Sequence, residues 1–358
     1  MDRSYALFLT CAIGATTALL SYIWSFASES FARRFGAIDK PTGGRKIHTK
    51  PIPLWGGFGI AVSILIVLVT LMSANVFSQG DVHTTQILGF IAGLLILLVG
   101  GMIDDAHPLS PQIQILFPIL AALVVIASRT GIVQVTNPSG GGLSLIWWRL
   151  GPVSLPADLI TFAWLLLATY ATKIQDGLDG LVTGLTVIGS GLVGALTLSL
   201  TFFQPMVALL AGIVGGAYLG FLPRNANPAK QFLGESGGSI AGFSLGVLAV
   251  LSSAKIAIAL AVLAIPITDV ILVVLGRIRR GVPWYKGDST HLHFRLLQAG
   301  FSQRTAVWLL WGVSLVAGLL ALSLQTRGKV FLIVTLVGLT ALTSFIAGLK
   351  SRRAQKDV

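Results

Sequence analysis

Acidic residues are few in this sequence, and their placement is its clearest chemical signal. Seven of the 13 Asp and Glu residues lie in or beside short polar segments that interrupt long apolar runs: Asp104, Asp105, Asp176, Asp179, Glu235, Asp269 and Asp288. In GMIDDAHPLSP, Asp104 and Asp105 end an apolar run as an adjacent like-charged pair. Two carboxylates at a helix C-terminus repel each other and oppose the helix dipole, so we expect a cation to compensate them. The alternative is an ordinary solvated loop.

A second polar segment, KIQDGLDGLVTG, spaces Lys173, Asp176 and Asp179 three residues apart. On a helix this spacing predicts that all three side chains share one face. Two carboxylates and an ammonium at the mouth of a membrane span are costly to desolvate unless they serve ions or phosphates. The alternative is a helix N-terminus whose dipole favours acids.

Glu235 lies in a third segment, FLGESGGS, among small residues that precede another apolar run. This pattern favours a tight turn that leads into a helix N-terminus, where backbone N–H groups can receive an anion. A turn without a binding role is the alternative.

The histidines lie in two basic segments. In GDSTHLHFRLL, His291 and His293 could bind a metal together, but without cysteines or a third histidine nearby we favour anion binding with Arg295. A solvated basic loop is the alternative. Arg45 and His48, in DKPTGGRKIHTKPIP, either share in the site or only follow the positive-inside rule.

Asp269 differs from the other acids because it lies within an apolar run, three residues after Pro266. A carboxylate inside a membrane span is a functional-site hypothesis by default. It could equally satisfy backbone groups that the proline frees.

The composition determines which kind of element must position these residues. Hydrophobic residues make up 54% of the chain and charged residues only 11%, against about 25% charged residues in soluble domains. A water-soluble globule is therefore excluded. The net charge of +12 does not indicate nucleic acid as a partner, because the basic residues lie in short loops between apolar segments. The single cysteine, Cys11, excludes an internal disulfide.

The elements themselves are predicted to be membrane-spanning helices, each of roughly 20 mostly apolar residues. We expect an all-α, polytopic membrane protein with a single domain over residues 1–358 and about 11 spans. These lie near residues 5–27, 54–76, 86–103, 113–128, 158–172, 181–200, 206–222, 239–253, 256–276, 306–324 and 330–349.

Alternate loops differ sharply in basic residues. One side holds 19 of the 25 Lys and Arg residues, in loops 28–53, 104–112, 173–180, 223–238 and 277–305 and in the basic tail 350–358. The positive-inside rule makes this side cytoplasmic, with the C-terminus inside and the N-terminus outside. We therefore expect a multi-pass protein of the cell (inner) membrane with its active site in these cytoplasmic loops. The segment around 137–144, before Trp147 and Trp148, is expected to be an external loop with an aromatic anchor.

Carboxylates and cations that meet at one membrane surface suit magnesium-assisted handling of phosphates. Mg²⁺ prefers one or two carboxylates, with substrate phosphates and water completing its coordination. A site facing both cytoplasm and lipid implies one water-soluble and one lipid substrate.

These motifs together resemble the polyprenyl-phosphate N-acetylhexosamine-1-phosphate transferases, glycosyltransferase family 4. The order RKIH with PIP and GG, DD, DGLDGL, FLGE-S-G and HLHFRLL covers Asp39 to about Leu297. HLHFRLL is more similar to the branch that transfers GlcNAc-1-phosphate to undecaprenyl phosphate than to the phospho-MurNAc-pentapeptide translocases, which stay as an alternative. The resemblance implies transfer of a sugar-1-phosphate from a UDP-sugar to a polyprenyl phosphate, with release of UMP, as the first membrane step of a cell-envelope glycan pathway.

The resemblance also implies roles for particular residues. Mg²⁺, or Mn²⁺ in its place, would be held by Glu235 with Asp176; Asp104 or Asp105 would position the lipid phosphate or assist its deprotonation; and Asp179 would orient the site. The residues expected to bind substrate are Lys173, His291, His293, Arg295, Arg45, His48, Asn225 and Lys230. A homodimer is left open.

Four positions depart from the family pattern. Glu235 stands for aspartate, Gln114 for a basic residue, Lys173 for a metal-binding asparagine and Phe294 for a third histidine. A protonated lysine cannot bind a metal, so we hypothesise that Lys173 takes the phosphate-binding role of the basic residue missing at position 114. An inactive binding protein and an ion-coupled transporter that uses the acids as ion sites are the rival classes.

Overall fold

Helices make up most of the structure. The computed structural model describes residues 1–41, 48–77, 80–137, 140–151, 153–252, 256–283 and 290–354. Its helices are α1 (Arg3–Phe35), α2 (Gly56–Ser73), α3 (Thr84–Ala106), α4 (Pro111–Gln114), α5 (Leu116–Ala127), α6 (Ala157–Gln175), α7 (Leu181–Thr197), α8 (Pro205–Asn225), α9 (Gly234–Leu251), α10 (Ile256–Val262), α11 (Ala264–Arg279), α12 (Leu292–Gln298), α13 (Gln303–Ser323) and α14 (Thr326–Ala354).

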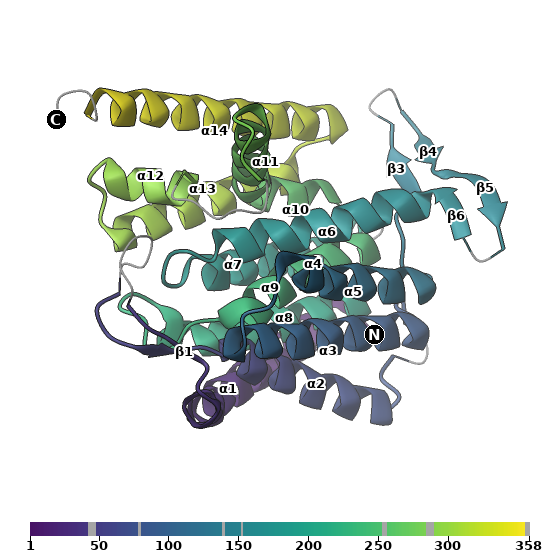
Figure 1. The fold of residues 1–358 in the computed structure, drawn as a ribbon. Helices are drawn as coiled ribbons and strands as arrows, with labels where there is room; N and C mark the ends of the chain where they lie inside the picture. Colours follow the sequence, from purple (N-terminus) through teal and green to yellow (C-terminus); the bar gives the residue numbers. More distant parts are fainter. Residues whose placement is uncertain are drawn as a thin grey trace.

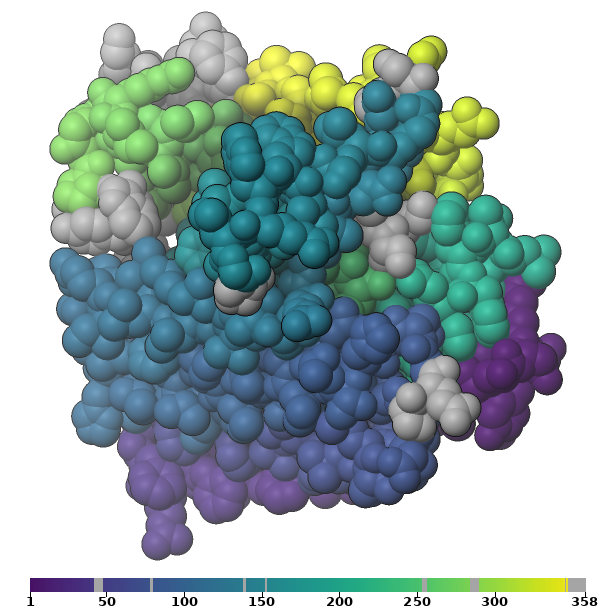
Figure 2. Space-filling view, turned by 90° about the vertical axis from the view of Figure 1, so that its right-hand side faces the viewer, coloured from purple at the N-terminus to yellow at the C-terminus, as the bar shows by residue number. Residues whose placement is uncertain are grey.

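In the part of the chain that the structure describes, six short strands form three antiparallel pairs. They are β1 (Ile38–Asp39) with β2 (Ile52–Pro53), β3 (Gln134–Thr136) with β4 (Gly142–Ser144), and β5 (Ile146–Leu150) with β6 (Val153–Pro156). The last two pairs project beyond one end of the helices, whereas α12 and β1 lie at the opposite end (Figure 1). Seen from the side that carries these hairpins, residues of β3–β6 (teal) lie over the blue N-terminal helices (Figure 2).

The prediction of an all-α, polytopic membrane protein is confirmed. Among the described residues, eight helices are long and apolar enough to cross a membrane, and α10 with α11, bent by 69°, makes a ninth span if the pair counts as one. Pro111–Ala127 and α7 are shorter apolar helices. Each of the 11 expected segments therefore coincides with a helix or a helix pair, while the number of spans stays a prediction.

Helix α9 lies at the centre of the molecule and carries the site's glutamate at its first turn (Figure 1). Its small residues let neighbouring helices approach closely: a Cβ at Gly242 would lie 2.0 Å from the carbonyl oxygen of Ala168 in α6. The Thr172 hydroxyl of α6 donates a 2.8 Å hydrogen bond to the Gly238 carbonyl. On the other side, Phe243 stacks on Phe90 of α3 with ring centroids 5.7 Å apart. Close packing of this kind holds membrane helices together where lipid removes the hydrophobic drive between them.

Two expectations about local structure are wrong. Asp176 and Asp179 do not share a helix face, because α6 ends at Gln175 and α7 begins only at Leu181. Glycines break the helix there, and Gly180 adopts a left-handed φ of 80°. The acids of α3 and α9 also lie within helix ends rather than in loops 104–112 and 223–238.

Helix α8 packs on α1 through a face of glycines, and this contact gives the first prediction. A Cβ at Gly220 would lie 1.9 Å from the carbonyl oxygen of Ala18 in α1. Gly220→Ala should force the helices apart and lower the midpoint of thermal unfolding in detergent, at a cost of about 1–3 kcal/mol. Gly191→Ala is the control, because a Cβ there meets nothing within 4 Å. Equal midpoints for the two variants would contradict this packing.

Candidate active site

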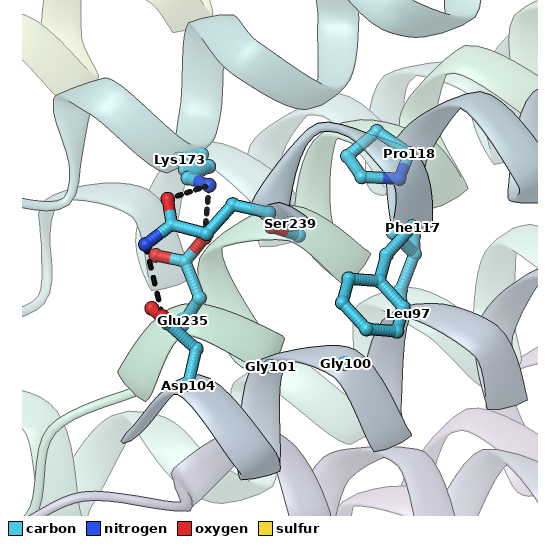
Figure 3. A pocket seen from close by; sticks show the side chains of 10 residues that line it. Leu97, Gly100, Gly101, Asp104, Phe117, Pro118, Lys173, Glu235 and Ser239 are labelled. Carbon is cyan, nitrogen blue, oxygen red and sulfur yellow. Dashed lines mark hydrogen bonds and ion pairs between the residues drawn. The ribbon is translucent and has the colours of Figure 1, made fainter. Parts of the chain in front are cut away.

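Polar side chains from α3, α4, α6 and α9 converge on one cavity at the end of these helices (Figure 3). The cavity has a volume of about 10 Å³, which is about the space of a single water molecule. Its lining is polar at one end and apolar at the other. One end is polar, with Asp104, Gln114, Lys173, Glu235 and Ser239, and the other is apolar, with Leu97, Phe117 and Pro118.

Asp104 lies in the last turn of α3 and is held by two donors. Its Oδ1 accepts hydrogen bonds from the backbone N–H of Leu109 at 2.7 Å and from the Gln114 side-chain amide at 2.9 Å. The amide oxygen of Gln114 in turn accepts from the Lys173 ammonium at 3.4 Å. Gln114 and Lys173, two of the departures from the family pattern, therefore contact each other.

Asp105 is the half-buried neighbour of Asp104 and faces the start of α9. Its Oδ1 accepts a 2.9 Å hydrogen bond from the backbone N–H of Glu235. The anion that the FLGESGGS turn receives is thus a side chain of the protein itself, at a helix N-terminus with a favourable dipole. The expectation that a cation compensates Asp104 and Asp105 is wrong, because among the described residues neither carboxylate forms an ion pair. Hydrogen-bond donors stabilise the two carboxylates instead.

The Lys173 ammonium forms an ion pair with the Glu235 carboxylate. It also lies 5.3 Å from the centre of the Tyr170 ring, one turn earlier on α6. The side chains of Lys173 and Glu235 are only 14% and 23% exposed, so solvent screens their attraction less than it would at the surface.

The turn between α6 and α7 carries the remaining two acids. Burial, together with the carboxylates of Glu235 and Asp179, raises the pKa of the Asp176 carboxyl to about 8. Asp179 accepts hydrogen bonds from the Asn227 side chain at 2.9 Å and from the Ala229 backbone at 3.0 Å. Asp179 therefore fixes the turn against the segment that follows α8. Asn227 was missed by the sequence analysis, because a single asparagine in a short loop carries no pattern.

The His-x-His segment lies against this turn and is fixed by Asp269. The carboxylate of Asp269 contacts Nδ1 of His291 at 2.8 Å and accepts a 2.8 Å hydrogen bond from the Leu292 backbone N–H. The observed partners of the Asp269 carboxylate are thus His291 and the Leu292 backbone N–H, and not backbone groups that Pro266 frees. His293 packs on the turn itself, since a Cβ at Gly177 would lie 2.5 Å from its Nε2. Burial lowers the pKa of His293 to about 4, although Asp269 opposes the shift, so this imidazole is neutral at pH 7.

The other predicted substrate-binding residues lie around this centre with partners of their own. Arg295 donates to the carbonyl oxygens of Thr290 and Ser344 and so ties α12 to α14. The amide of Asn225 accepts from the Gly180 N–H and the Thr183 hydroxyl and donates to the Gln231 carbonyl. These contacts give both residues a structural task, and their substrate-binding roles stay predictions.

The last three predicted substrate-binding residues are His48, Lys230 and Arg45. His48 is 3.7 Å from the Asp39 carboxylate and packs edge-on against Phe232, three residues before Glu235. Lys230 is exposed. Arg45 and Asp288 lie outside the described residues.

The donor set suits magnesium better than a transition metal. Within the described ranges, no three His, Cys, Asp or Glu side chains form a group that could hold an ion by themselves. Asp176 and Glu235 interact electrostatically, and they come from adjoining helix ends. Mg²⁺ is usually bound by one or two carboxylates together with substrate phosphates. The two side chains fit such an ion, provided that Lys173 gives up its contact with Glu235.

The fold and site together define a polytopic membrane protein with a carboxylate-rich polar centre at one end of its helix bundle. Comparison with known proteins is more specific. The sequence profile of glycosyl transferase family 4 matches residues 87–253, which include all the acids from Asp104 to Glu235. Over these residues the chain is similar to this family, in agreement with the resemblance that its motifs carry.

Curated relatives cover nearly the whole chain. A probable undecaprenyl-phosphate N-acetylglucosaminyl 1-phosphate transferase of Bacillus subtilis is 27% identical over 91% of this chain and 88% of its own length. A decaprenyl-phosphate N-acetylglucosaminephosphotransferase of Mycolicibacterium smegmatis is 28% identical over 84% of this chain and 78% of its own. The undecaprenyl-phosphate alpha-N-acetylglucosaminyl 1-phosphate transferase of Escherichia coli K12 is 26% identical over 85% of this chain and 80% of its own length.

The contacts of Asp269 give the second prediction. Asp269→Ala leaves the buried Leu292 N–H without a partner, which costs about 1–3 kcal/mol, and should lower the midpoint of thermal unfolding in detergent. Asp269→Asn keeps one carbonyl oxygen for that N–H and should lose less. A loss as large for asparagine as for alanine would contradict this assignment.

Proposed function

We propose that this protein transfers N-acetylhexosamine-1-phosphate, with GlcNAc-1-phosphate as the first candidate, from a UDP-sugar to undecaprenyl or another polyprenyl phosphate and releases UMP. The observation that carries the proposal is the convergence of Asp104, Lys173 and Glu235 on a cavity whose opposite end is apolar. The names of the relatives agree with it, since each relative is named as a probable or established polyprenyl-phosphate N-acetylglucosamine phosphotransferase.

The two-sided cavity suits an acceptor that is a phosphate at one end and a hydrocarbon at the other. Phe117 and Leu97 would receive the first apolar carbons, while the acceptor phosphate lies near Lys173. At about 10 Å³ the cavity admits no phosphate as it stands, so binding must move side chains. The Lys173 side chain is the natural one to move, because its four-carbon stem is flexible.

The reaction needs positioning and charge neutralisation more than covalent chemistry. An oxygen of the lipid phosphate attacks the β-phosphorus of the UDP-sugar, a new P–O bond forms to that phosphorus, and the bond to the bridging oxygen breaks so that UMP leaves with the electron pair. Asp104, which lines the cavity, would position the attacking phosphate. Lys173 would lie where the acceptor phosphate meets the donor diphosphate and would offset the charge of both. Asp105 would act indirectly, by holding the N-terminus of α9.

The remaining site residues would hold the donor. His293 is neutral at pH 7 and would contribute hydrogen bonds to the diphosphate, while Asp269 orients His291 beside it. Mg²⁺ bound by Glu235 and Asp176 would supply the charge that offsets the diphosphate. Mn²⁺ would serve in the same way.

The proposal includes an orientation in the membrane. UDP-sugars are water-soluble, so the site and the C-terminus would face the cytoplasm, on the side that holds 19 of the 25 basic residues. The β3–β6 hairpins, with the exposed Trp147 and Trp148, would lie at the outer surface of the cell membrane.

The rival transporter has less support from the contacts. Asp269, the carboxylate deepest in an apolar segment, is already engaged with His291 and the Leu292 N–H. The acids lie at one end of the helices, whereas transport sites usually lie near the middle of the bilayer.

Incubation of the purified protein with radiolabelled UDP-GlcNAc, polyprenyl phosphate and Mg²⁺ tests the function. A lipid-linked product is expected, and exchange of labelled UMP into UDP-sugar should fall by at least about 10²-fold in Glu235→Gln, because the variant loses a charged ligand. Arg33→Met, which removes an exposed ion pair with Glu29, is the control and should keep full activity. Absence of lipid product, or uptake of substrate into vesicles instead, would refute the transferase; unchanged exchange in Glu235→Gln would refute the metal assignment.

The contact between Lys173 and Gln114 makes the exchange hypothesis testable. Each of Lys173→Asn and Gln114→Lys should lower kcat/KM about tenfold, the first by removing the site's cation and the second by adding a like charge beside it. The double variant restores one cation and should recover most of the loss. If the double variant is much worse than either single variant, Lys173 has not replaced the basic residue.

A further inference from the structure

The Lys173 ammonium is paired with the Glu235 carboxylate, which is one of the two proposed ligands of the metal ion. Its ammonium pairs with Glu235, hydrogen-bonds to Gln114 at 3.4 Å and lies over the Tyr170 ring. These three contacts hold the ammonium beside Glu235, although its flexible stem would let it reach another partner. Because Gln114 also donates to Asp104, the same ammonium links the carboxylates of α3 and α9.

A divalent ion and this ammonium cannot both keep their best positions at Glu235. Mg²⁺ binds a carboxylate oxygen at about 2.0–2.1 Å, and a lysine in direct contact with the same carboxylate would then face a double positive charge at close range. In a partly buried site that repulsion is weakly screened. The ion pair and the metal are therefore competing states of Glu235.

A phosphate group offers the ammonium another partner. The cavity borders Lys173, Glu235 and Asp104 alike, so a phosphate entering there would reach the ammonium without a change in the helices. Transfer of Lys173 from Glu235 to a phosphate oxygen would open the cavity and free the carboxylate at once.

We infer that Lys173 is a tethered counter-cation that holds Glu235 until a phosphate substrate draws it away, so that divalent metal and nucleoside diphosphate bind in a coupled manner. The identity of the phosphate rests on the proposed function; the competition at Glu235 does not. By linkage, the diphosphate then raises metal affinity and the metal raises diphosphate affinity by the same factor.

Mn²⁺ binding measured by electron paramagnetic resonance tests this without turnover. The full-length protein in detergent is titrated with Mn²⁺ alone and then with UDP present. Lys173→Met should bind Mn²⁺ alone at least about tenfold more tightly than the natural protein, because a nearby positive charge is gone. UDP should raise the Mn²⁺ affinity of the natural protein by a larger factor than that of Lys173→Met.

Three further variants make the result specific. Lys173→Met combined with Glu235→Gln should lose the gain, and Arg33→Met, which removes a cation from another carboxylate, should behave as the natural protein. Lys173→Gln, which keeps polarity and should show the same gain, replaces Lys173→Met if the latter is not monodisperse.

Mn²⁺ affinity that is unchanged or weaker in both lysine variants overturns the inference. If those variants gain affinity while no lipid-linked product forms in the transfer assay, the inference holds and the proposed function fails. If transfer occurs and depends on Glu235 but the lysine variants bind Mn²⁺ as the natural protein does, the function stands and the inference fails.

Discussion

The cost of burying carboxylates at the end of an apolar helix bundle is the constraint on which this structure depends. Unpaired charges there would be prohibitively expensive, and the protein meets the cost in three ways. Asp105 uses the N-terminus of α9, Asp104 and Asp179 use amide and backbone donors, and Glu235 uses the Lys173 ammonium. Of these partners, only the Lys173 ammonium could be drawn away by a substrate, because the other donors hold the fold together.

Helix packing makes these contacts available. Glycines on α9 bring α6 within backbone contact, so that Lys173 and Asp176, at the end of α6, lie beside Glu235 in the first turn of α9. The glycine that ends the α6–α7 turn allows the chain to reverse there. The Asp269 contact with His291 holds the His-x-His segment, whose His293 packs against Gly177 of the same turn.

Much of this could be predicted from the sequence, and the reasons for the exceptions are physical. Apolar run length located the helices that are long enough to span a membrane, because each span must satisfy its own backbone hydrogen bonds. It did not locate the short helix α12, which lies in the segment 277–305 that was predicted as a loop. Scarcity of charge singled out the acids. Spacing alone could not show that the helix breaks between Asp176 and Asp179, nor that Asp105 would face a helix N-terminus instead of a cation. Contacts between distant segments, such as Asp269 with His291 and Asp179 with Asn227, leave no local pattern.

The central claim is that Glu235 changes partners, from Lys173 to a metal ion, when phosphate binds. The most direct measurement is a cryo-electron-microscopy structure of the full-length protein with UDP-GlcNAc and Mg²⁺. We expect the Lys173 ammonium to lie on a phosphate oxygen and the metal to lie on Glu235 with Asp176. A structure in which Lys173 still pairs with Glu235 while the metal and diphosphate are bound elsewhere would contradict the account.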